Sequence, residues 1–313
     1  MKHLLTIDAH SDTVYSAKKQ NIRMYDTDGK THLDLKNLLE STPHIQFFAL
    51  YSDLRDPDKH YHDILETLDF LYSHLYQYSY SLKLIEKRKD LEECLMPGKL
   101  GIIIAIEGSY LLDGNPHRLQ QLHRLGIRCL SLTWNDSNGL SGGIGDSEDR
   151  GLSPLGKEIV NKAHELGIIL DVSHISRRGF WDIIDIADKP IIATHSNCIT
   201  ICSHPRNLDD SQLKAIGELN GVVGINFVPD FLGKDKANVS GIVDHIEYVM
   251  DKAGKNCVGL GSDFDGMEKL PDDIRGCEAY YLIECELAKR NFSGEEIGKI
   301  MGGNLKRIIE AVI

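Results

Sequence analysis

The sequence has no long hydrophobic run, no excess of positive charge and no closely paired cysteines. No segment approaches the roughly 20 apolar residues of a membrane-spanning helix, which argues against an integral membrane protein. Lys and Arg number 35 against 47 Asp and Glu, and this net charge of −12 disfavours binding to nucleic acid or to anionic membranes. The 7 cysteines include no CxxC pair, so we expect reduced thiols and no disulfide framework.

The two ends of the chain lack targeting signals of the usual kinds. Near the start, residues 4–7 lead straight into a predicted strand, without the charged and apolar regions of an export signal. Residues 304–313 alternate charged and apolar side chains, which is typical of an amphipathic helix and not of a lipid anchor. We therefore expect a cytoplasmic protein that does not associate with membranes.

Short apolar runs bounded by turn residues recur along the chain and predict parallel strands. Several are apolar throughout, as strands covered on both faces are, and helical patterns separate most of them. The predicted strands are residues 4–8, 45–51, 101–106, 127–133, 168–172, 190–194, 222–227 and 258–262. The predicted helices are residues 58–86, 116–125, 154–166, 176–187, 210–218 and 239–253.

Strand and helix in alternation, with eight strands, predict an α/β fold of the (β/α)8 TIM-barrel type. We expect a single domain over residues 1–313, with a helical segment at about 272–313 that packs around the barrel. A doubly wound open sheet is the alternative, but no strand is followed by the GxGxxG turn that would support it. Residues 135–151, which are rich in glycine, are predicted to form a long mobile loop near the site.

Imidazoles and carboxylates follow the predicted strands at the points where the strands end. His10 and Asp12 follow the first strand, Glu107 follows the third, and His174 and His195 follow two consecutive later strands. Each alone has an ordinary interpretation as a capping or hydrogen-bonded residue, but together they match the ligands of a metal-dependent hydrolase. We predict two half-sites bridged by Glu107, one with His10 and Asp12 and the other with His174 and His195. Two Zn²⁺ ions held this way would share and ionise one water.

Two further charged residues suit the chemistry of such a site. Asp263 leaves the last predicted strand, where it could accept a proton from the water and pass it to a leaving amine. Asp265 and Gly266 follow it as a turn signal, so we assign the turn to Asp265. Arg206 offers a planar fork that would bind a substrate carboxylate.

These motifs resemble the membrane (renal) dipeptidase family of zinc peptidases, M19, within the amidohydrolase-like barrels. The resemblance implies His10 and Asp12 on one metal, Glu107 as bridge, and His174 and His195 on the other. It also implies Asp263 as the proton-handling residue and Arg206 as the carboxylate ligand. The matching segments, which span nearly the whole chain, are residues 8–13, 106–108, 151–156, 171–176, 194–197, 206–207, 224–227 and 261–266.

The chain departs from the family pattern after the fourth predicted strand. The best-known animal members carry a histidine there that helps to hold the tetrahedral intermediate, whereas this chain has Trp134 and Asn135. Either the polar donor is lost or Asn135 supplies it. We predict Asn135 and Asn226 as substrate-binding residues beside Arg206.

The resemblance implies hydrolysis of the amide bond of dipeptides by a hydroxide that bridges the metals. L-D dipeptides are plausible substrates, and the family habit suggests a homodimer. The alternatives are another binuclear metallohydrolase acting on a lactone, a cyclic amide or a phosphotriester, and a catalytically silent barrel used as a binding module. Many such relatives use a carboxylated lysine as the bridge, so Glu107 favours the dipeptidase branch.

Overall fold

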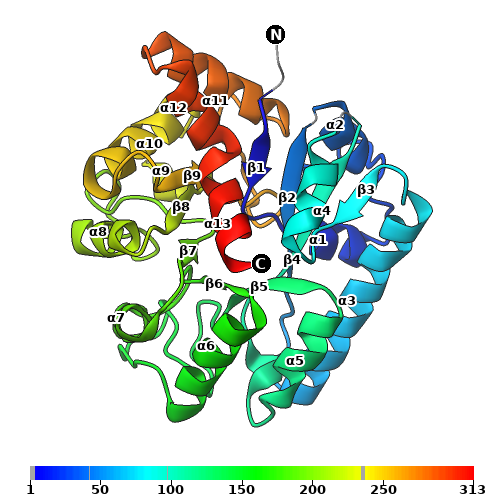
Figure 1. Ribbon diagram of the computed structural model, residues 1–313, viewed down its shortest axis with the longest axis vertical. Helices are drawn as coiled ribbons and strands as arrows, with labels where there is room; N and C mark the ends of the chain where they lie inside the picture. The colour runs from blue at the N-terminus through cyan, green and yellow to red at the C-terminus, as the bar shows by residue number, and fades with distance from the viewer. Residues whose placement is uncertain (1–3, 42, 97, 234–236) are drawn as a thin grey trace.

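A computed structural model describes residues 4–41, 43–96, 98–233 and 237–313, and within these ranges it confirms the predicted barrel. Eight of its nine strands run parallel around a closed ring, because β2 pairs with β4 as well as with β1. Figure 1 shows the ring with helices around it. The ring strands are β1 (Thr6–Asp8), β2 (His44–Leu50), β4 (Leu100–Ile106), β5 (Ile127–Ser131), β6 (Ile169–Asp171), β7 (Ile192–Ala193), β8 (Val222–Ile225) and β9 (Val258–Leu260).

Six of the eight ring strands end one or two residues before the predicted ends, and β1 and β4 end where predicted. The predicted apolar runs are therefore longer than the paired strands, and the residues after each strand are free to leave the sheet. This matters for function, because the side chains of the site stand on these short exits at the carboxyl edge of the barrel.

The ninth strand, β3 (Leu82–Leu84), corrects the predicted helix over residues 58–86. The helix α3 (Pro57–Gln77) ends earlier, and Leu82 to Leu84 pair in parallel with the first half of β4. At Ile104 the register of β4 shifts, and its second half pairs with β5 on the same side. Leu82 and Leu84 alternate with Lys83, as in a strand, and the pairing places this strand beside β4 outside the ring. Helical periodicity within the segment does not reveal this pairing.

The C-terminal segment is helical as predicted, but it does not only pack around the barrel. Figure 1 shows α13 (Asn304–Val312) across the middle of the ring. Leu305, Ile308 and Ile309 join one buried cluster with inward-facing strand residues such as Ile7 and Phe47. The helix therefore closes the amino-terminal end of the barrel, opposite the site, and its removal would expose this core to water.

Helix ends follow the local signals in the sequence. Ser153 accepts a hydrogen bond from Gly156 N at the start of α6, and Gly167 at its end has a positive φ of 73°. No helix in the described ranges is long and apolar enough to cross a membrane. The remaining helices are α1 (Thr13–Gln20), α2 (Leu35–Glu40), α4 (Arg88–Cys94), η1 (Tyr110–Leu112), α5 (His117–Arg124), α6 (Pro154–Leu166), α7 (Arg177–Ile186), α8 (Asp210–Glu218), α9 (Pro229–Leu232), α10 (Val239–Ala253), α11 (Glu278–Lys289), α12 (Gly294–Gly298) and η2 (Lys299–Gly303).

Candidate metal centre

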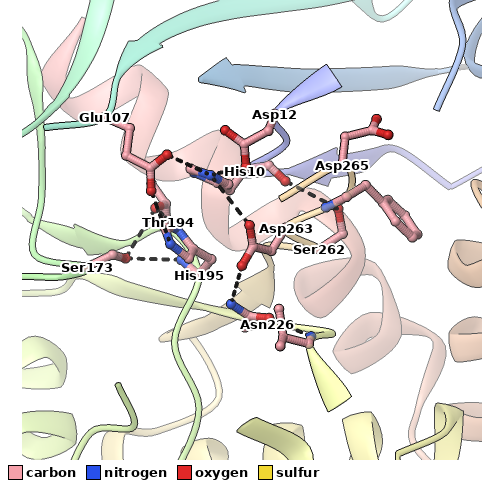
Figure 2. Close-up of polar contacts among 12 residues, drawn as sticks. His10, Asp12, Glu107, Ser173, Thr194, His195, Asn226, Ser262, Asp263 and Asp265 are labelled. Carbon is pink, nitrogen blue, oxygen red and sulfur yellow. Dashed lines mark hydrogen bonds and ion pairs between the residues drawn. The ribbon is translucent and has the colours of Figure 1, made fainter. Parts of the chain in front are cut away.

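The polar residues predicted at the strand exits lie together at the carboxyl edge of the barrel. The two carboxylate oxygens of Glu107 lie near different imidazoles, those of His10 and His195 (Figure 2). Oε2 lies 3.7 Å from His10 Nε2, and Oε1 lies 3.0 Å from His174 Nε2 and 3.6 Å from His195 Nε2. All four side chains are buried. Burial raises the pKa of Glu107 well above its usual range, against the opposing effect of His10.

His174 and His195, the two imidazoles near Glu107 Oε1, direct the lone pairs of their Nε2 atoms at each other. Thr194 Oγ1 donates its hydrogen to Asp171 Oδ2 at 2.7 Å. The same oxygen therefore accepts the hydrogen bond at its 2.7 Å contact with His195 Nδ1, which carries the ring proton. His174 Nδ1 likewise lies 2.8 Å from Asn135 Oδ1, an acceptor. Both Nε2 atoms are then unprotonated, yet they are only 2.7 Å apart. Two lone pairs at this distance repel each other unless a cation lies between them and the carboxylate.

His10 is surrounded by acids that stabilise a positive charge. Its Nε2 is buried without a hydrogen-bond partner, 3.4 Å from Asp12 Oδ2 and 3.8 Å from Asp263 Oδ1. Burial favours the neutral ring, but Glu107, Asp12 and Asp263 raise the pKa of His10 to about 10. The same acids would equally stabilise a divalent cation. The donor set of imidazole nitrogens and carboxylate oxygens therefore fits a metal such as zinc.

Asp12 reaches the site from the start of a helix. β1 ends at Asp8, so His10 and Asp12 follow the strand as predicted, and Asp12 occupies the N-cap position of α1, with φ −94° and ψ 17°. The side chains converge because the backbone of Ser11 pairs with Phe264 in an isolated bridge and holds the exit in place.

Asp263 lies as close to His10 as Glu107 does, so its position fits either a proton-handling residue or a metal ligand. Asn226 Nδ2 donates to Asp263 Oδ2 at 2.9 Å. Burial raises the pKa of Asp263 to about 6, with an added effect from Asp12. Its φ of +63° is a left-handed conformation that is unusual outside glycine. A Cβ at Gly266 would collide with the carboxylates of both Asp12 and Asp263, so glycine is required there.

Asp265 has a wider role than the predicted turn. It does have a left-handed φ of +68°. Its carboxylate also accepts hydrogen bonds from Thr13 Oγ1 at 2.6 Å and from His32 N at 2.7 Å. The residue therefore ties the β9 exit to α1 and to the loop before α2.

Two buried aspartates that the sequence analysis did not single out hold neighbouring strand exits together. Asp171 Oδ1 accepts from Ser173 N and Thr194 N, both at 2.9 Å. Asp8 accepts from Ser262 Oγ at 2.6 Å and from Tyr280 Oη at 2.7 Å. Both are the last residues of strands that lead to a predicted ligand, and this shared position was the available signal.

The contact between Thr194 and His195 leads to a testable prediction. Thr194→Val removes the hydroxyl that fixes the His195 tautomer while keeping the side-chain shape. We expect zinc affinity to fall about 10- to 100-fold, as is usual when the outer partner of a ligating histidine is lost. Competition with a chromophoric chelator measures this. Thr194→Ser retains the hydroxyl and should bind zinc as the unmodified chain does; equal affinity in the valine variant would contradict the role.

Arg206, Asn135 and Asn226 occupy different positions around the centre. Arg206 is 8% exposed, donates to His195 O at 3.2 Å and lines the pocket. Asn135 also lines the pocket, although its Oδ1 is engaged by His174. Asn226 is fully buried and lies behind Asp263, where it holds that carboxylate. The substrate contacts predicted for all three stay predictions.

Several other residues have contacts outside the cluster. Cys198 Sγ and Cys202 Sγ point to the backbone oxygens of His245 and Asp230 and do not join the cluster. Arg128 donates to backbone oxygens that include Glu86 O at 2.8 Å. All seven cysteines are free thiols.

A pocket of about 600 Å³ opens over the cluster. The predicted loop over residues 135–151 contributes Ile144 and Gly145 to its wall, beside Trp134. This loop lies near the site as predicted. Ile144 N donates a hydrogen bond to His174 O and Gly145 N donates one to Asn135 O, both at 2.8 Å. The mobility of the loop stays a prediction.

Parallel strands closed into a ring, with imidazoles and carboxylates meeting at their carboxyl ends, define a (β/α)8 barrel with the donor groups of a metal-dependent hydrolase. The profile of the membrane dipeptidase family (peptidase family M19) matches residues 1–313. The chain belongs to this family, which confirms the resemblance seen in its motifs.

Named relatives and solved structures agree with this assignment. An uncharacterized dipeptidase of Schizosaccharomyces pombe is 31% identical over 98% of this chain and 80% of its own length. The dipeptidase tcpJ of Claviceps purpurea is 30% identical over 90% of this chain and 69% of its own. The crystal structure of the metallopeptidase dipeptidase AC has a TM-score of 0.91 at 25% identity, and covers 99% of both chains. These similarities support a metal-dependent hydrolase of dipeptides.

Proposed function

We propose that the chain is a zinc-dependent dipeptidase with two ions per site, and that it hydrolyses L-L and L-D dipeptides. The observation that carries the proposal is the convergence of three buried imidazoles on Glu107, with the unprotonated Nε2 atoms of His174 and His195 2.7 Å apart. His10, Asp12 and Glu107 would hold one ion, and Glu107, His174 and His195 the other. Bound zinc ions supply an ionised water near neutral pH and polarise the peptide carbonyl.

The protein groups around the centre bind the substrate and move the proton. Arg206 binds the free carboxylate and thereby sets the direction of the dipeptide. Asp263 accepts the proton of the water at Oδ1 and gives it to the leaving amine. Burial raises the pKa of this carboxyl to about 6 in the absence of metal, and bound cations would favour the ionised form that accepts the proton. Asn226 holds Oδ2, so that Oδ1 remains directed at the reacting atoms.

The proposal is tested with zinc-loaded protein and a panel of small substrates. We expect amine release from L-Ala-L-Ala and L-Ala-D-Ala, and much slower release from the amidated dipeptide L-Ala-L-Ala-NH₂, which offers Arg206 no carboxylate. A solved metallopeptidase from Rhodobacter sphaeroides, 24% identical with a TM-score of 0.90, binds a phosphinate mimic of L-Ala-D-Ala, which motivates that substrate. Turnover of lactones without any turnover of dipeptides would contradict the proposal. The homodimer and the cytoplasmic location stay predictions.

A further inference from the structure

The pocket over the metal centre has two walls of different character on opposite sides of the barrel. In the ring order, β2 lies across from β7. Tyr51 directly follows β2, whereas Arg206 follows β7. Both line the pocket, together with Asp12, Glu107, His174 and Asp263 of the candidate metal centre. A molecule bound to Arg206 through its carboxylate therefore extends across the centre toward Tyr51.

Three aromatic rings form the wall on the Tyr51 side. We call Tyr15, Tyr51 and Trp134 the aromatic wall; they come from α1, the β2 exit and the β5 exit, and all three line the pocket. The rings of Tyr15 and Tyr51 meet edge to face with centroids 5.4 Å apart. The centroid of Trp134 lies 5.3 Å from that of Tyr51. Such contacts make one continuous aromatic surface.

Charged residues outside the pocket hold the rings in place. Asp53 accepts a hydrogen bond from Tyr15 Oη at 2.7 Å and another from Tyr51 Oη at 3.0 Å. Both hydroxyls are thus engaged by Asp53. The guanidinium of Arg55 lies 5.6 Å from the centroid of Trp134 and pairs with Asp136 at 3.0 Å, which joins the β2 exit to the β5 exit. A wall fixed by these contacts is preformed, so binding a side chain against it costs little conformational entropy.

We propose that the aromatic wall is the subsite for the side chain of the amino-terminal residue and selects aromatic or large aliphatic side chains there. This inference rests on the proposed dipeptidase function. With the carboxylate on Arg206 and the amide bond at the metal centre, the amino-terminal residue has only the far side of the pocket to occupy. Phe231, which lies 5.8 Å from the Arg206 guanidinium, is the aromatic residue of the opposite wall and would contact the carboxyl-terminal residue.

A pair of dipeptides with exchanged sequences tests the assignment. For Trp134→Ala and Tyr51→Ala we expect kcat/KM for L-Phe-L-Ala to fall roughly 10-fold or more, from the loss of buried aromatic contact. The value for L-Ala-L-Phe should change less than about 3-fold, since its ring lies on the other side. The unmodified chain should favour L-Phe-L-Ala over L-Ala-L-Ala.

Matched variants separate the wall from general damage to the site. Tyr51→Phe keeps the ring and removes only the hydroxyl that contacts Asp53 and Arg55, so its preference should remain close to that of the unmodified chain. Phe231→Ala should show the reverse pattern, with the larger loss on L-Ala-L-Phe. Equal losses on both dipeptides in the wall variants, at unchanged zinc content, would overturn the subsite and leave the dipeptidase proposal intact. Failure of the unmodified chain to cleave any dipeptide would overturn both.

Discussion

Asp263→Asn is expected to keep its zinc and to lose roughly 10²- to 10⁴-fold in kcat, the usual contribution of a positioned acid or base. The amide cannot accept a proton, whereas its size and its contact with Asn226 can be kept. The measurement is kcat on L-Ala-L-Ala together with zinc content per chain. The exposed residue Asp230 in α9 offers a matched control, because Asp230→Asn makes the same change of charge near the pocket without touching the centre.

Zinc content decides between the two interpretations of Asp263. Its Oδ1 lies 3.8 Å from His10 Nε2, and His10, Asp12 and Asp263 could together hold an ion. If Asp263 handles the proton, the asparagine variant keeps both ions and loses rate. Loss of one ion would make Asp263 a ligand, and unchanged kcat with both ions bound would remove it from the reaction altogether.

The pH profile gives a second measurement on the same residue. Burial raises the pKa of Asp263 to about 6 in the absence of metal, and bound cations would lower it by favouring the ionised form. Only the ionised carboxylate accepts a proton, so kcat/KM should rise with pH through this pKa and fall below it. We expect the acid limb at or below pH 6 in the unmodified chain, and its loss in Asp263→Asn.

Glu107→Gln is expected to lose both zinc ions and with them the activity. Its two oxygens face His10 on one side and His174 and His195 on the other, so one amide substitution weakens both half-sites. The loss of zinc affinity should exceed the roughly 10- to 100-fold that follows from changing an outer partner of a ligand. Metal analysis after dialysis, and the rate on L-Ala-L-Ala, measure the two effects.

Asp12→Asn is the comparison that makes this result specific. Asp12 contacts only the His10 side of the cluster, so we expect its variant to keep the ion held by His174 and His195. We expect Asp12→Asn to retain one zinc ion. If Glu107→Gln also retains one ion, Glu107 does not bridge the two ions. Circular dichroism of both variants distinguishes loss of metal from loss of fold.

Much of the site could be predicted because its residues directly follow the carboxyl ends of the strands. Runs such as Ile102 to Ile106 are too apolar to lie anywhere but in a covered strand, and the polar residue that follows must emerge at an edge. Parallel strands of one barrel share that edge, so the sequence alone predicts that Glu107, His174 and His195 lie together. The eight ring strands were found in the same way.

Local pattern failed where distant contacts decide the structure. The helix over residues 58–86 was wrong because pairing with β4 makes residues 82–84 a strand, and periodicity within the segment cannot reveal a partner. The position of α13 depends on the amino-terminal end of the barrel, which forms only when the eight strands close into a ring. The left-handed backbone at His174 and Asp263, with φ of 66° and 63°, has no signature in a non-glycine sequence.

The sequence by itself determined the barrel, the chemical types of the site residues and the edge at which they stand, because burial and strand period act on neighbouring residues. Only the tertiary structure decided which nitrogen of each imidazole faces Glu107 and which rings face Arg206 across the pocket. The Thr194 and Asn135 contacts fix the first, and Asp53 and Arg55 fix the second. Thr194 is adjacent to His195 in the chain, whereas Asn135 and His174, Tyr15 and Asp53, and Arg55 and Asp136 come from different segments that the closed ring brings together.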